Sequence, residues 1–245
     1  MCNRLLLLTI FCCCLAICAV EPALICAQDY KTELERGKAA LDAGAVDEAE
    51  SILSRLISND PQAQHYYYRG LALGAQSKDD LAIEDFNQAI RLDPNQASYY
   101  FRRGIVQLRN GIFRQAISDF TKALELDPGM SQSLGYRARA FFMANQQEQA
   151  LQDLARCIQG NPSNGALYAL RGDILSSAGE YASAIQDYDK AIQLRPNDPT
   201  IYNNRGIALA NIGRTREALT DLNTAMDMAS TAPIPAQMSA PGGYW

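Results

Sequence analysis

Residues 97–130 read ASYYFRRGIVQLRNGIFRQAISDFTKALELDPGM, and the same pattern recurs along most of the chain. The recurrence is marked by prolines that follow one another at intervals of 33, 34, 34 and 34 residues: Pro61, Pro94, Pro128, Pro162 and Pro196. A fixed period in this range indicates an array of stacked structural repeats. Proline cannot continue a helix and disfavours helical angles in the residue before it, so each proline is expected to follow the second helix of a repeat.

Small and large apolar residues recur in register with these prolines. An Arg-Gly pair occurs in five of the patterns, and Arg137-Ala138 takes its place in a sixth. Sixteen residues after each small residue comes a large apolar one: Leu53, Phe86, Phe120, Leu154, Tyr188 and Leu222. Apolar spacings of three and four predict amphipathic helices, in which glycine costs about 1 kcal/mol relative to alanine. We therefore expect each repeated glycine to lie in a helix–helix contact with no room for a methyl group.

Other residues mark where the helices begin and end. Four glycines fall between the two helices of a repeat, where a left-handed cap needs glycine: Gly44, Gly111, Gly179 and Gly213. Asp29, Asn164 and Asp198 precede predicted first helices and suit the N-cap position. Pro199 then takes the first helical position, where its missing N–H costs nothing.

A charged pattern accompanies the glycines. The arginine that precedes each small residue is matched by an aspartate sixteen positions later in five repeats: Arg69/Asp85, Arg103/Asp119, Arg137/Asp153, Arg171/Asp187 and Arg205/Asp221. The first repeat departs from this, with Arg36 but Ile52. We predict that each pair forms an ion pair that fixes the stacking of the helices. The alternative is a ladder of arginines that binds anions.

Together these columns resemble the tetratricopeptide repeat (TPR), a helix–turn–helix unit of 34 residues. The resemblance implies an all-α fold, a right-handed α-solenoid of six units within residues 28–229. The units are 30–62, 63–96, 97–130, 131–164, 165–198 and 199–229. The terminal units are atypical, with Leu56 in a column of small residues and Ser230 in place of a proline. Such departures are expected where a repeat has only one neighbour.

Residues 1–27 form a separate segment. A short basic start that ends at Arg4 precedes 16 residues without charge, 5–20, and Glu21-Pro22 follows. These features predict a secretory signal peptide, cleaved after Ala27, and hence an exported protein. A retained membrane anchor and a lipid anchor are the alternatives. The apolar run is short for a spanning helix, and Cys18 and Cys26 each follow an isoleucine rather than a small residue.

The remaining residues offer few candidates for a catalytic or metal-binding site. Six of the seven cysteines lie in residues 1–27, so Cys157 has no disulfide partner in the predicted array and is expected to be a buried small residue. A reactive thiol is the alternative. The single histidine, His65, is expected at the surface, and no zinc site or catalytic motif accompanies it. The net charge of −5 disfavours nucleic acid as a partner. We expect no cofactor, no metal and no enzymatic activity.

The resemblance also implies a concave face, lined by the first helix of each unit. Its N-terminal half carries the candidate peptide-binding residues, which are Tyr67, Leu71, Phe101, Ile105, Leu108, Arg109, Arg139 and Phe142, and Met143 is expected on the same face. Its C-terminal half is small and polar, with Ala169, Asp173, Ser176, Ser177, Asn203, Ile207, Ala210 and Asn211. The Lys and Asn pair by which some TPR domains hold a C-terminal carboxylate is absent. An error of one residue in register would rotate a helix by about 100° and turn some of these residues into the core.

The prediction is therefore a non-enzymatic, exported scaffold that binds a protein or an extended peptide. The alternative is a TPR assembly factor of the cell envelope, held by a membrane or lipid anchor. Residues 230–245 hold three prolines and two glycines and are predicted to be irregular. They are either disordered or cover the last helix pair through Ile234, Met238 and Trp245.

Overall fold

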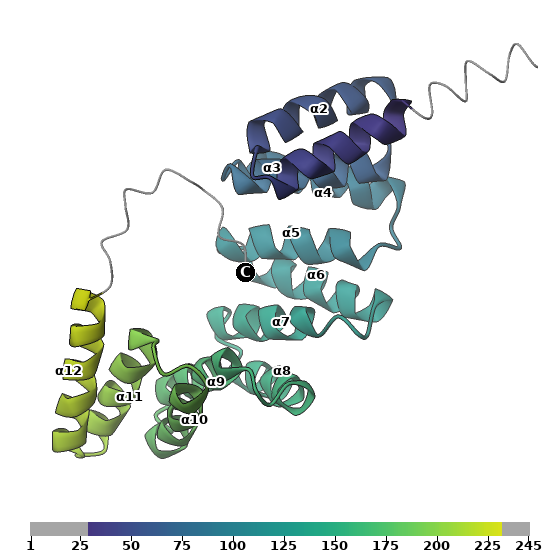
Figure 1. Ribbon diagram of the computed structural model, residues 1–245. Helices are drawn as coiled ribbons and strands as arrows, with labels where there is room; N and C mark the ends of the chain where they lie inside the picture. The colour runs from purple at the N-terminus through teal and green to yellow at the C-terminus, as the bar shows by residue number, and fades with distance from the viewer. Residues whose placement is uncertain (1–28, 232–245) are drawn as a thin grey trace, which may run out of the picture. The chain divides into compact units, whose positions relative to one another are not determined.

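The computed structural model describes residues 29–231, in which all regular structure is α-helical (Figure 1). The helices form pairs, and we call the first helix of each pair the A helix and the second the B helix. The A helices are residues 29–42, α3 (Ala63–Ala75), α5 (Ala97–Arg109), α7 (Ser131–Met143), α9 (Gly165–Ser177) and α11 (Pro199–Asn211). The B helices are α2 (Val46–Asn59), α4 (Asp79–Leu92), α6 (Phe113–Leu126), α8 (Gln147–Gly160), α10 (Tyr181–Leu194) and α12 (Thr215–Thr231).

The described helices fall into two compact units, divided between Pro94 and Asn95. The first unit contains residues 29–42 and α2 to α4, and the second contains α5 to α12. Within each unit an A helix packs against the B helix of its own pair and against the B helix before it. In the second unit the A helices α5, α7, α9 and α11 also contact one another in that order. The chain is thus an all-α solenoid of helix–turn–helix repeats.

The predicted glycine contacts are confirmed. A Cβ on Gly104 would lie 2.8 Å from Phe120, and one on Gly172 would lie 2.7 Å from Tyr188, both closer than real Cβ contacts allow. Where the B helix carries leucine the space is wider, and a Cβ on Gly206 would be 3.1 Å from Leu222. The glycine column therefore lets an A helix and a B helix approach over an aromatic ring.

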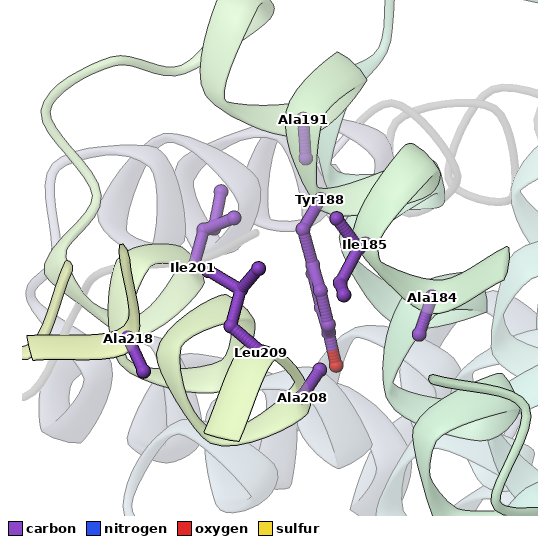
Figure 2. Packing of buried hydrophobic residues seen from close by; sticks show 8 residues of the cluster. All are labelled: Ala184, Ile185, Tyr188, Ala191, Ile201, Ala208, Leu209 and Ala218. Atoms are coloured by element: carbon purple, nitrogen blue, oxygen red, sulfur yellow. The ribbon is translucent and has the colours of Figure 1, made fainter. Parts of the chain in front are cut away.

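The core follows the same columns. The alanines and large apolar residues of these columns are buried, as Ala116 and Phe120 are in α6, except for Leu222, which is half-buried. Figure 2 shows one such cluster in the second unit, where Tyr188 of α10 lies among Ile185, Ala208 and Leu209. Tyr188 thus contacts both its own A helix and the next pair, so that the core runs along the stack of the second unit.

The turn and cap predictions hold with one exception. Gly44, Gly111, Gly179 and Gly213 have φ between 75° and 81°, and Ser77 and Asn145 take the same place in the two other turns. The side chain of Asn164 accepts a hydrogen bond from the N–H of Ala166, and Asp198 accepts one from Thr200, both at 3.1 Å. The prediction for Asp29 is wrong, because residue 29 is already helical.

Two predictions concern segments that lie outside the described residues. These are the signal peptide at 1–27 and the role of 232–245, whereas Ser230 still belongs to α12. Within residues 29–231, no helix combines the length and apolar composition needed to cross a membrane.

Candidate functional site

Each of the five predicted Arg–Asp pairs joins the A and B helices of one repeat. The guanidinium Nε and Nη2 donate to the two carboxylate oxygens, at distances of 2.6 to 2.8 Å, as in Arg103–Asp119 and Arg137–Asp153. The five aspartates are buried. Arg36, which has no aspartate in register, pairs with Glu33 instead. The ion-pair prediction is confirmed, and these five guanidinium groups serve the fold rather than an anion.

Each of these arginines also contacts an aromatic ring on its own helix, and some of them bond a polar group of the preceding repeat. In each of the five repeats an aromatic ring lies 5.7 or 5.8 Å from the guanidinium carbon: Tyr66, Tyr100, Phe141, Tyr168 and Tyr202. Nη1 of Arg137 also donates to Thr121, and Nη1 of Arg205 donates to Asp189. Each such arginine therefore ties its own pair to the B helix before it.

The candidate concave residues of the first unit are partly buried. Tyr67 and Leu71 both lie on α3. The ring of Tyr67 is 5.1 Å from that of Tyr68 and 6.0 Å from that of Phe86. Tyr67 therefore shares its ring contacts between an A-helix neighbour and the core aromatic of α4.

In the second unit the structure separates the candidate residues into core and surface. Phe101 is 6% exposed, and its ring lies 6.0 Å from Phe120 and 5.4 Å from Tyr136, so it is a core residue rather than part of an open face. Ile105 and Leu108 are half-buried against the same cluster, and Phe142 packs partly against the core around Leu154. Arg109 and Arg139 are exposed. The physical reason for the difference at Phe101 is its helical phase, which points it at the B helix.

A continuous surface emerges when equivalent positions of the A helices are compared. Residues spaced by three and four share one helix face, and the four neighbouring A helices of the second unit each present such a triplet. We call this set the A-helix surface: Arg102, Ile105 and Arg109; Tyr136, Arg139 and Met143; Leu170, Asp173 and Ser177; Asn204, Ile207 and Asn211. All twelve residues are exposed or half-buried, and Met143 and Ile207 are 52% and 48% exposed.

Four members of this surface were missed by the sequence reasoning. They are Arg102, Tyr136, Leu170 and Asn204, which lie three residues before members that were recognised. The signal that could have found them is the repeat itself, because all four occupy one position of the 34-residue period.

Charge is unevenly distributed over the A-helix surface. Arg139 makes no ion pair within residues 29–231, and neither does Arg102, whose guanidinium lies 5.8 Å from the ring of Phe101. Asp173 of α9 is the one acidic side chain of the surface. The α5–α7 half is thus basic and apolar, and the α9–α11 half is mainly neutral and polar.

Asp173 links three helices. Its Oδ1 accepts hydrogen bonds from the hydroxyl of Tyr188 on α10 and from Nδ2 of Asn204 on α11, both at 2.9 Å. Burial raises the pKa of Asp173 above its usual value, while these two donors and the charge of Arg139 oppose the rise. The carboxylate is therefore held in place and already satisfied by the protein.

Comparison with known proteins agrees with this architecture. Residues 70–111 and 172–213 match the family model described as TPR repeat, and residues 97–130 match the one described as tetratricopeptide repeat. The chain contains tetratricopeptide repeats. No curated protein matches it.

Solved structures share the fold of this TPR chain. A crystal structure of MamA protein is 24% identical and has a TM-score of 0.63, with 69% of this chain and 92% of that chain covered. YrrB, described as a TPR protein with an unusual peptide-binding site, is 20% identical over 74% and 93% of the two chains, with a TM-score of 0.61. A tetratricopeptide repeat protein from Parabacteroides merdae is 18% identical over 82% and 80%, with a TM-score of 0.72. Identities this low show the fold alone.

Two shallow cavities lie elsewhere in the TPR units. One, of about 330 Å³ in the second unit, is lined by Asp189, Arg205 and Arg214 among others, and the other, of about 190 Å³ in the first unit, by Glu50 and Arg69 among others. Both adjoin an Arg–Asp pair, and neither is lined by the A-helix surface. Their arginines are already paired, so these cavities offer no unpaired guanidinium group to a ligand.

The two residues singled out for possible chemistry are both buried. His65 is 2% exposed, with Nδ1 2.6 Å from the carbonyl oxygen of Asp60, so the prediction of a surface histidine is wrong. Cys157 is buried as predicted, and burial raises the pKa of its thiol to about 11. Within residues 29–231, His, Cys, Asp and Glu form no group of three that could hold a metal ion.

Proposed function

We propose that the protein is a non-enzymatic scaffold whose A-helix surface binds a protein or an extended peptide segment. The observation that carries this proposal is the row of exposed side chains at equivalent positions of α5, α7, α9 and α11. The columns that build the fold are buried or paired, whereas Met143 and Ile207 expose large apolar side chains that no fold requirement explains. Exposed apolar groups bordered by charge are typical of protein interaction sites.

The neighbouring structures support this use of the fold. YrrB is a TPR protein described as having an unusual peptide-binding site. A stack of A helices of the kind described above offers a partner similar contacts from one repeat to the next. An extended segment can follow such a row because its own side chains recur at regular intervals.

The hydrogen-bond partners and the burial of the titratable groups favour recognition over catalysis. Asp173 is engaged by Tyr188 and Asn204, His65 by a backbone carbonyl, and the Cys157 thiol is buried with a raised pKa. A nucleophile or general base needs access to its substrate and a suitable protonation state. Asp173 and His65 are instead hydrogen-bonded within the fold, and the Cys157 thiol is buried.

We further propose that residues 1–27 direct export and are removed. The basic start and the short uncharged run of 16 residues support this, and retention as a membrane or lipid anchor is the alternative. The intact mass of the protein isolated from cells that make it distinguishes these outcomes. A chain that begins at Gln28 is expected, whereas an uncleaved or lipid-modified chain would contradict export by cleavage and favour the anchored form.

The binding proposal can be tested with selected peptides. Random peptides of about twelve residues, long enough to span several A helices when extended, are displayed on phage and selected on the protein. Affinities of the selected peptides are then measured by fluorescence anisotropy. We expect Met143→Gln and Ile207→Gln to weaken binding by about tenfold each, or about 1.4 kcal/mol.

Met226→Gln provides the matched control. Met226 is 70% exposed on the B helix α12 and lies outside the A-helix surface. This variant should leave affinity within about twofold of the unchanged protein, less than about 0.5 kcal/mol. Peptides that bind all three variants equally, or that are weakened only by Met226→Gln, would place the binding site elsewhere.

A further inference from the structure

The A and B helices of the second unit carry opposite charge. The A helices α5, α7, α9 and α11 contain three, two, one and one arginines, seven in all, and a single acidic residue, Asp173. The B helices α6, α8, α10 and α12 contain nine acidic and five basic residues. This segregation occurs in a chain whose net charge is −5, so the positive A-helix side is not a consequence of overall composition.

The ion pairs account for only part of the A-helix charge. Four of the seven arginines are paired with B-helix aspartates. Two others, Arg102 and Arg139, make no ion pair within residues 29–231; they belong to the A-helix surface and lie on the adjoining helices α5 and α7. The one acidic side chain on that surface, Asp173, is held by Tyr188 of its own repeat and by Asn204 of the next repeat.

Apolar side chains accompany the arginines on the same faces. Ile105 lies between Arg102 and Arg109 in the α5 triplet, and Tyr136 and Met143 lie on either side of Arg139 in the α7 triplet. Guanidinium groups bind carboxylates through two parallel N–H donors, and they are less strongly hydrated than ammonium groups. Arginines set among aromatic and aliphatic side chains therefore suit a segment in which acidic and apolar residues alternate.

We infer that the α5–α7 half of the A-helix surface binds an acidic segment of a partner protein, with carboxylates on Arg102 and Arg139 and apolar side chains against Ile105 and Met143. The inference rests on the proposed binding function and specifies the chemistry of the partner. A nucleic acid is the less suitable polyanion, because phosphate backbones require an extended basic footprint and the protein is acidic overall.

The test uses three labelled peptides of about twelve residues that share the same leucines and phenylalanines. Their remaining positions are all Glu, all Gln or all Lys. Fluorescence anisotropy gives the affinity of each peptide at about 50 mM and about 200 mM salt, where screening differs. We expect the Glu peptide to bind about tenfold more tightly than the Gln peptide and the Lys peptide to bind most weakly. Only the Glu peptide should lose affinity as salt rises.

Variants locate the effect on the surface. Arg102→Gln and Arg139→Gln should each weaken the Glu peptide by about fivefold to tenfold and leave the Gln peptide within about twofold. Arg156→Gln is the matched control, because Arg156 is exposed on the B helix α8 and its loss changes the net charge equally. Thermal unfolding followed by circular dichroism confirms that each variant is folded.

Several results would overturn the inference. Equal affinity for the three peptides, or a preference for Lys, would refute the acidic partner and leave the binding function intact. If Arg156→Gln weakened the Glu peptide as much as Arg102→Gln and Arg139→Gln do, the preference would reflect general electrostatic attraction rather than this surface. Tighter binding of a single-stranded DNA of similar length would favour nucleic acid as the partner. If none of the three peptides binds, an excess of Glu and Asp in the phage-selected peptides supports the inference and its absence overturns it. If no selected peptide binds either, both proposals fail.

Discussion

At the scale of single residues, the turn inside each repeat requires one residue with positive φ. In one repeat this residue is Ser77, for which a left-handed backbone conformation is unfavourable. Four turns use glycine and one uses Asn145, whereas Ser77 has a φ of 59°. Left-handed angles cost an L-residue about 1–2 kcal/mol, and glycine escapes this cost. We expect Ser77→Gly to raise the free energy of unfolding by about 1 kcal/mol, allowing for the greater freedom of glycine in the unfolded chain. Urea denaturation measures the change, and Gly111→Ser should lower stability by a similar amount. A loss of stability in Ser77→Gly would contradict the assignment of strain.

A second residue, Asp173, makes stability depend on pH. Burial raises its pKa above the ordinary value of 3.8, so the folded state binds more protons than the unfolded state between that value and the raised one. The contribution of Asp173 to stability is therefore greatest at pH values below 3.8 and is lost as the pH rises from there through the raised pKa. Asp173→Asn keeps an oxygen for Tyr188 and Asn204 but removes the charge. We expect the variant to gain stability relative to the unchanged protein as pH rises from about 3.5 to about 7. Urea denaturation at several pH values tests this, and a difference that is independent of pH would refute it.

At the scale of the helix pair, Gly104 and Phe120 should depend on one another. A methyl group at Gly104 would meet the ring of Phe120 at 2.8 Å, and overpacking of this kind costs about 1–3 kcal/mol. The pair Ala138 and Leu154 shows that alanine is accommodated where the opposite residue is leucine. We expect Gly104→Ala to destabilise the protein by about 2 kcal/mol and Phe120→Leu to recover part of that loss in the double variant. Free energies of unfolding for the four proteins form a double-mutant cycle. Additive effects would show that the glycine is not kept for this contact.

The helix pair is also where prediction from sequence succeeds best. Periodic columns gave the glycine contacts, the Arg–Asp pairs and the positive-φ turns, because each depends on residues at fixed spacing in one repeat. Phe101 and His65 were assigned to the surface and are buried. Their burial depends on helical phase and on single tertiary contacts, such as the one between His65 and the carbonyl oxygen of Asp60. Such contacts do not recur with the repeat period, so the periodic pattern does not predict them. Arg102 and Tyr136 were missed for the converse reason, since nothing in their own residue type marks an exposed face.

At the scale of the whole molecule, stability and recognition use different residues. The alanine, arginine and aspartate positions that are nearly constant from repeat to repeat are buried or paired and build the stack. Positions that vary, such as Arg102, Tyr136, Leu170 and Asn204, occupy one place on the A-helix surface. A repeat array can therefore change its partner while its Arg–Asp pairs and glycine positions stay the same. Tyr136 has both roles, because its ring also packs against Phe101 and Phe120 of the core.

The division of the described chain into two units leads to a prediction about fragments. The clusters that form the core of the second unit draw all their members from residues after Asn95, and they extend over four helix pairs. The first unit has two pairs, and a cluster around Leu53 forms part of its core. Because about three repeats are needed to bury a continuous core, we expect fragment 95–231 to be helical and to unfold cooperatively, and fragment 29–94 to be largely unfolded. Circular dichroism and urea denaturation test both.

A third fragment controls for length. Fragment 113–231 begins at α6 and lacks α5, which leaves Asp119 without Arg103 and Phe120 without the helix that covers it. Removal of α5 exposes the apolar surface that it covered, and the lost burial of a side chain such as Phe120 alone costs about 1.5–3 kcal/mol. Although 113–231 retains most of the second unit, it should therefore be much less stable than 95–231. If 113–231 were as stable as 95–231, the helix pair would not be the unit of stability in this protein. If 95–231 were unfolded, the second unit would depend on residues before Asn95 for its core.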